Sequence, residues 1–211
     1  MKKGVVIGCS AVLLLVVVAG AFAWFKVIAP AFKAGSELVG IARQIEQYQA
    51  LNGDIRNQSP YSAPADGTLS PPQVEAVLAV QRHIRDGMAH RLKELEQHYK
   101  ALEAEFESGG RQPGIEDLAR AYSDLFGLIV DAKRLQVEAL NRQGLSMAEY
   151  HWARVATLHA AGISISGVLQ LEGDIAAQVR ARHQVPEGNV ALVEPHAKEL
   201  IETAVLAAMG L

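Results

Sequence analysis

The chain has 211 residues, of which 50% are hydrophobic and 20% charged, and its formal net charge is −3. Of its 20 basic residues, Lys2, Lys3 and Lys26 precede residue 31, so residues 31–211 carry 17 basic against 23 acidic residues, a balance of about −6. An acidic balance of this kind argues against nucleic acid as a partner and against broad adhesion to anionic lipid.

An uncharged, apolar run at residues 4–25 directly follows two lysines. As a helix it would be about 33 Å long, enough to cross a hydrocarbon core of roughly 30 Å. We predict a signal-anchor over residues 1–29 that spans the membrane through residues 4–28, with Trp24 and Phe25 as an interfacial anchor. The short N-terminus then stays in the cytoplasm. The chain is accordingly expected to be a single-pass inner-membrane protein with its C-terminal domain in the periplasm of a bacterial envelope.

Two other fates of this segment stay open. Ala21-Phe22-Ala23 fits the small-x-small pattern of a signal-peptidase site, and cleavage there would release a soluble periplasmic protein. Val6-Ile7-Gly8-Cys9 resembles a lipoprotein processing site, although only five residues separate Cys9 from the lysines. Because Cys9 is the only cysteine, the part of the chain that follows the run contains no disulfide.

The composition behind the anchor favours helices over sheet. Alanine, leucine, glutamate, glutamine and arginine are abundant, aromatic residues make up only 6%, and no alternating β pattern occurs. We therefore predict an all-α fold, in which the transmembrane helix is followed by an antiparallel up-and-down bundle of long helices.

The next two segments lead from the anchor to the bundle. Apolar residues at Leu38, Ile41, Ile45 and Tyr48 follow helical spacing and predict a stalk helix within residues 30–51. Residues 52–69 concentrate Asn, Gly, Ser and Pro and predict an extended linker. The remaining residues, 70–211, form the predicted bundle domain.

Two helix starts in this domain share one pattern. Leu69-Ser70-Pro71-Pro72-Gln73-Val74 combines a Ser N-cap, Pro at the first position, Gln at the third, and a hydrophobic staple. Leu145-Ser146-Met147-Ala148-Glu149-Tyr150 repeats it. The first start predicts a helix that runs to about Glu107 and carries a heptad seam of apolar residues. A further helix is predicted over residues 115–143, and the second start begins the helix after it. Small residues at 162–167 then predict a break, and a last helix ends at Met209.

A ladder of potential metal ligands lies along the first of these helices. Asp86, His90, Glu94 and His98 are spaced four residues apart and share one drifting face. Imidazole and carboxylate groups suit divalent Zn, Ni or Cu, and a residue from another helix would complete such a site. The competing interpretation is a solvated face, because charged residues surround the ladder.

Signatures of enzymes are missing from the sequence. It lacks the HExxH, G-x-S-x-G, P-loop and G-x-G-x-x-G motifs, and it has no cysteine nucleophile outside the anchor. We therefore expect no enzymatic activity and no resident cofactor apart from a possible transition metal.

The aromatic stretch at residues 150–154 is interpreted as core packing with a cation–π contact, or else as a binding surface.

The two capped starts at Leu69–Gln73 and Leu145–Glu149 resemble the Leu-Thr-x-x-Gln repeats of small periplasmic helical stress proteins, the CpxP/Spy-like group. The second start carries Glu149 where that motif has Gln. The resemblance implies long antiparallel helices and a role as a chaperone or envelope-stress adaptor, and related metal-sensing members bind metal through His and Glu. The L-S-x-x-E-Y start is also similar to one found in membrane-anchored bacterial helical proteins of unassigned function.

The sequence as a whole predicts a periplasm-facing adaptor, scaffold or chaperone-like protein that acts through protein contacts. The alternatives are a metal-binding or stress-sensing envelope module and a cleaved, soluble periplasmic binding protein. A protein partner is expected and nucleic acid is not, while homo-oligomerisation is left open.

Overall fold

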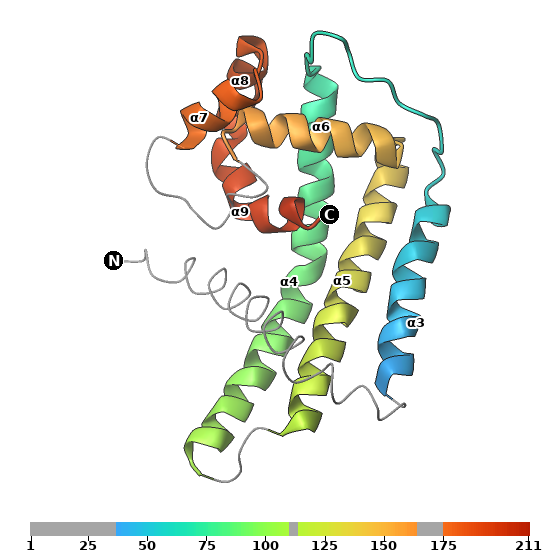
Figure 1. Ribbon diagram of the computed structural model, residues 1–211, viewed down its shortest axis with the longest axis vertical. Helices are drawn as coiled ribbons and strands as arrows, with labels where there is room; N and C mark the ends of the chain where they lie inside the picture. Colours follow the sequence, from blue (N-terminus) through green and yellow to red (C-terminus); the bar gives the residue numbers. More distant parts are fainter. Residues whose placement is uncertain (1–36, 110–113, 164–174) are drawn as a thin grey trace.

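The computed structural model describes residues 37–109, 114–163 and 175–211 (Figure 1). All regular secondary structure in these ranges is helical, which confirms the predicted all-α class. The α-helices in chain order are α3 (Glu37–Ala50), α4 (Pro71–Glu107), α5 (Ile115–Gln143), α6 (Met147–Ala160), α7 (Ile175–Arg182), α8 (Glu187–Val193) and α9 (Ala197–Ala208), with 3₁₀ turns η2 (Leu51–Asp54) and η3 (Glu194–His196).

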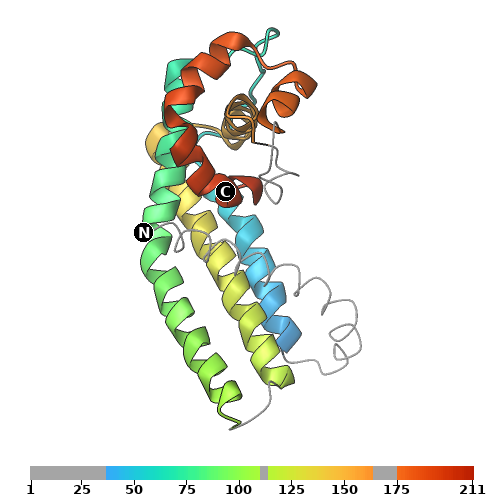
Figure 2. The ribbon, with the colours of Figure 1, turned by 90° about the vertical axis from the view of Figure 1, so that its left-hand side faces the viewer.

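Three of the helices form a single layer. Helices α4, α5 and α3 lie side by side with α5 in the middle (Figure 1, Figure 2). The chain runs down α4 and back up α5, so this pair is antiparallel as predicted. Helix α3 packs on α5, so the predicted stalk is part of the bundle.

The up-and-down pattern stops after α5. Helix α6 crosses the upper ends of α4 and α5, and the short helices α7, α8 and α9 gather around its C-terminal end, with α9 also packed on α4 (Figure 1). The physical cause is local. Gly144 takes the left-handed conformation at the C-cap of α5, with φ 69°, and Ser146 then caps a new helix two residues later.

We divide the molecule into a head and an arm. The head comprises residues 71–88, 128–163 and 175–211; the arm comprises α3, residues 89–107 of α4 and residues 115–127 of α5. All of the largest fully buried side chains belong to the head, including Leu78, Ile84, Leu140, Tyr150 and Leu158. None of the arm's described side chains is buried. The head therefore supplies the core on which the fold depends.

Both predicted helix caps are present, in different forms. At the second start, the Glu149 backbone N–H donates to Ser146 Oγ at 3.2 Å, as a capping box requires. At the first, the Ser70 backbone N–H donates to Gln73 Oε1 at 3.1 Å, but the Ser70 hydroxyl donates to the same oxygen. Gln73 Nε2 also donates to Glu149 Oε1 at 3.2 Å. The two starts that carry the family resemblance therefore touch each other.

The predicted linker is extended but held against the head. Ile55 and Leu69, near its two ends, are 3% and 4% exposed. Asn141 Oδ1 accepts from the Arg56 backbone N–H at 2.7 Å, and Asn189 Oδ1 accepts from the Leu69 backbone N–H at 2.8 Å. These contacts make residues 55–69 a strap that joins α3 to the head.

The predicted break after α6 is present at its first residue. Helix α6 ends at Ala160, and Gly162 has φ +77°. A Cβ at Gly162 would lie 2.4 Å from the Ala176 Cβ, so this close approach of α7 requires glycine. The rest of the predicted break, residues 164–167, lies outside the described residues. Pro195 kinks the last helical segment at η3.

The predicted anchor at residues 4–28 and the first part of the stalk, residues 30–36, lie outside the described residues, as do the side chains of Leu38 and Ile41. Within the described parts, none of the helices combines the length and the apolar character needed to span a membrane.

Candidate functional site

The predicted metal ladder lies on the solvent-facing side of α4. The His90 and Glu94 side chains are 84% and 57% exposed, and His90 Nδ1 lies 3.5 Å from Glu94 Oε1. Asp86 is paired with Arg85 at 2.9 Å instead of with an imidazole, and the His98 ring packs edge-on against Tyr99. The pattern of contacts is that of a solvated helix face.

The described neighbours of the ladder do not complete a metal site. In the described ranges, no group of three or more His, Cys, Asp or Glu side chains is arranged to hold a metal ion. A cavity of about 300 Å³ between α4 and α5 does bring Glu94 and His98 near Asp124, but Arg91 and Arg120 line the same space. Cations in the cavity oppose binding of a further cation.

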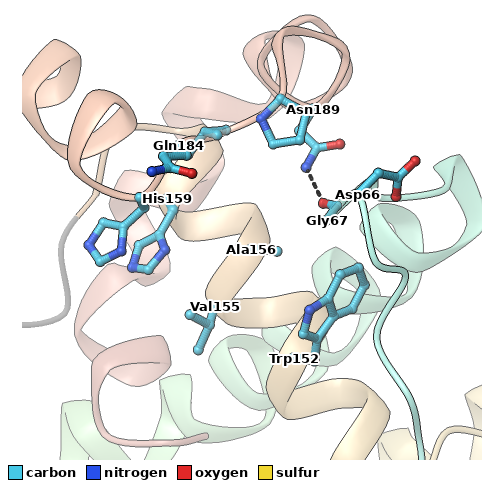
Figure 3. A pocket seen from close by; sticks show the side chains of 11 residues that line it. Asp66, Gly67, Trp152, Val155, Ala156, His159, Gln184 and Asn189 are labelled. Carbon is cyan, nitrogen blue, oxygen red and sulfur yellow. Dashed lines mark hydrogen bonds between the residues drawn. The ribbon is translucent and has the colours of Figure 1, made fainter.

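A second cavity, of about 210 Å³, lies along the outer face of α6; we call it the α6 groove. Its floor comes from four positions that share one side of that helix, Trp152, Val155, Ala156 and His159 (Figure 3). The walls are formed by the strap and by the segment between α7 and α8, through Asp66, Gly67, His183, Gln184, Val185, Pro186 and Asn189.

The wall nearest Trp152 is fixed by polar and aromatic contacts. Asn189 is 2% exposed, and its Nδ2 donates to the Gly67 carbonyl at 2.9 Å (Figure 3). The Trp152 ring packs on Tyr61 of the strap with centroids 5.5 Å apart. The Asp66 carboxylate accepts from the Thr68 backbone N–H, which lowers the pKa of Asp66. This end of the groove is therefore rigid and carries a negative charge at neutral pH.

Two imidazoles are stacked at the other end. The His159 and His183 rings have centroids 3.6 Å apart and are inclined by only 16°. Burial and the neighbouring His183 lower the pKa of His159 below 6.5. Among the described residues neither ring is hydrogen-bonded to another protein group, so their nitrogens are available to solvent.

A buried polar cluster lies on the other side of α6. Gln81 Nε2 and the Tyr150 hydroxyl donate to the Leu211 carbonyl at 2.6 and 2.9 Å, and Gln136 Nε2 donates to the Gly210 carbonyl at 2.8 Å. Burial raises the pKa of Tyr150 to about 12, so its hydroxyl stays protonated and able to donate. The cluster fixes the residues after α9 to α4, α5 and α6.

Two cations are buried next to this cluster. Lys133 and Arg154 are 3% and 4% exposed, and in the described parts of the chain neither has an acidic side chain as partner. Lys133 Nζ donates to Gln136 Oε1 at 2.7 Å and lies over the Tyr48 ring, while Arg154 lies over the Tyr150 ring. Burial, and then the charge of Arg154, lower the pKa of Lys133 to about 8.

The aromatic stretch at residues 150–154 divides between both interpretations made from the sequence. Tyr150 is fully buried and makes the expected cation–π contact with Arg154. Trp152 instead faces the α6 groove. The His159–His183 stack was not predicted, because the two residues are 24 positions apart and meet only where α7 packs against α6.

Comparison of this chain with family models, with curated proteins and with solved structures finds no match.

Proposed function

We propose that this chain is a membrane-anchored, periplasm-facing adaptor, scaffold or chaperone-like protein. It would act through protein contacts made by the arm. The observation that supports this most is the openness of the arm. Its helices form one layer, and the head covers only the upper ends of α4 and α5 (Figure 1, Figure 2).

The arm carries apolar side chains that its own layer only half covers. Ile45 on α3 is 44% exposed. Half-buried apolar residues of the arm also lie on its two longer helices: Leu92, Leu95, Tyr99 and Leu102 on α4, and Leu125 and Phe126 on α5. A helix added to such a layer would bury these side chains, which is a common mode of recognition for amphipathic helices.

The order of the chain supports a position of the arm close to the membrane. Helix α3 begins at the same end of the layer as the α4–α5 turn (Figure 1). The predicted span ends at Ile28 and α3 begins at Glu37, nine residues later, so at most about 30 Å of chain separates them. The 37 residues of α4 are about 55 Å long. The arm would then face membrane-bound partners, with the head directed away from the membrane.

Two exposed isoleucines provide a matched test of this proposal. Ile45 lies on the arm, and Ile201, 53% exposed, lies on α9 in the head. The full chain would be crosslinked in cells that carry it natively, and the adducts compared for wild type, Ile45→Glu and Ile201→Glu. We expect a discrete adduct that Ile45→Glu removes and Ile201→Glu keeps. An adduct that is equally strong in both variants, or no adduct in wild type, would contradict the proposal.

The mass of the adduct also decides between two kinds of partner. A mass of twice the chain would identify a second copy, and any other discrete mass a different protein.

The metal-binding alternative has no assembled ligand set to support it among the described residues. The soluble alternative depends on cleavage at Ala21-Phe22-Ala23, which the mass of the mature N-terminus would reveal.

A further inference from the structure

Helix α7 is attached to α6 by few contacts. Arg180 Nε donates to the Ala160 carbonyl at 2.9 Å, the Val179 side chain is 7% exposed, and Gly162 lies against Ala176. The remaining described contact that ties the end of α7 to α6 is the His159–His183 stack. The stack is therefore one of a small set of described contacts that hold α7, and the one at its C-terminal end.

The turn after α7 is itself strained. Gln184 has φ +49°, and it is the only described residue other than glycine with a positive φ. A side chain with a Cβ is disfavoured in this conformation, so the surrounding contacts must hold the turn in place. Gln184 directly follows His183, so a loss of the stack would allow the turn to relax.

We propose that the His159–His183 stack is an acid-sensitive latch, which holds α7 and residues 183–186 against α6 at neutral pH and releases them when both imidazoles are protonated. Two neutral rings, or one neutral and one charged ring, can stack in this geometry. Two imidazolium ions with centroids 3.6 Å apart repel each other, because two like charges are brought together at short distance even though one of the rings is exposed to solvent.

The charged groups around the latch do not offset this repulsion. Asp66 lies in the same groove, but on the strap, and its carboxylate accepts from Thr68. Arg180 and Arg182 on α7 are cations and supply no negative charge, and Glu187 at the start of α8 is exposed. In the described part of the chain no carboxylate is bonded to either imidazole.

The direction of the pH response follows from His159. Its pKa is lowered in the folded protein, so the released form binds protons more readily than the latched form. Release is therefore favoured as the pH falls below about 6.5, by up to tenfold per pH unit through His159. Release would uncover the apolar floor of the α6 groove, Val155 and Ala156.

Hydrogen exchange in α7 tests the latch on the full chain in detergent micelles. After correction for the intrinsic exchange rate, we expect the protection of residues 176–182 to fall about tenfold or more between pH 7 and pH 5, while the core of α4 changes little. His183→Phe keeps a stacked ring without a second charge, so it should stay protected at both pH values. His90→Gln removes an exposed imidazole on α4 and should respond like wild type.

Three outcomes would overturn the latch. The first is unchanged protection of α7 in wild type between pH 7 and pH 5. The second is a full pH response in His183→Phe, which would place the sensor elsewhere. The third is loss of the response in His90→Gln, which would assign it to the α4 ladder. His159→Gln provides a second variant, for which the pH response should also disappear.

Discussion

The Lys133 ammonium is 3% exposed on α5, and its replacement by methionine should change the pH dependence of stability. Burial lowers the pKa of Lys133 from 10.5 to about 8. The unfolded chain therefore binds a proton more tightly than the folded chain, and the charged lysine destabilises the fold at neutral pH. A difference of about 2.5 pKa units corresponds to about 3 kcal/mol at pH 7, since one unit is about 1.4 kcal/mol.

The sign of the effect is fixed by the direction of the shift. The cost is fully present below pH 8 and falls as the pH rises toward 10.5, where the unfolded lysine also loses its proton. Methionine has no proton to lose, but it leaves Gln136 Oε1 without its donor and removes the contact with Tyr48, which together cost about 1–2 kcal/mol. We expect Lys133→Met to be more stable than wild type by about 1–2 kcal/mol at pH 7, and this difference to shift toward wild type by about 2–3 kcal/mol by pH 10.

Urea unfolding of the full chain in a mild detergent, followed by circular dichroism at pH 7 and pH 10, measures this shift. Lys198→Met on α9 is the control, because Lys198 is exposed and its replacement should leave the pH profile of wild type almost unchanged. Parallel pH profiles for Lys133→Met and wild type would refute the reasoning, because they would mean that the buried ammonium is not destabilised.

Three further predictions concern local structure and the anchor. Gly162→Ala should lower the free energy of unfolding by more than about 1 kcal/mol, because Gly162 has a φ of +77° and an added Cβ would collide with Ala176. Gly53→Ala should change it little, because no atom lies within 4 Å of a Cβ added there. Equal effects of the two substitutions would contradict the close approach of α7. Ser146→Ala should cost about 1 kcal/mol and Ser70→Ala less, since only Ser146 Oγ accepts from a helix N–H; urea midpoints that reverse this order would sink the cap assignment. The full chain should stay with the membrane pellet after an alkaline wash, and its appearance in the supernatant would count against the predicted anchor.

The features that were readable from the sequence are those set by neighbouring residues. Both capped starts were predicted because a cap involves residues three positions apart, and the structure places helices at both. The helix end at residue 143 and the break at Gly162 were readable for the same reason, because a glycine follows each helical pattern, and both glycines have a positive φ. The charged neighbours of the ladder were readable too, and the structure places His90 and Glu94 on an exposed face.

The candidate site was not readable in this way. The α6 groove joins the strap to the α7–α8 segment, more than 100 positions later, and to α6 between them, and the local periodicity of a sequence gives no information on such contacts. The burial of Lys133 depends on tertiary packing, including the Tyr48 ring of α3, although its own sequence surroundings resemble an exposed face. The crossing of α6 over the layer likewise depends on tertiary packing, so the up-and-down order predicted for residues 70–211 holds for α4 and α5 but not for the helices after them.

The most direct test of the central claim is site-specific photo-crosslinking in living cells. A photoreactive residue would replace Ile45 on the arm or Ile201 on the head, in otherwise identical full chains. The account predicts that position 45 captures one discrete protein and that position 201 captures none, because the open apolar layer belongs to the arm. Capture at position 201 with none at position 45 would contradict it.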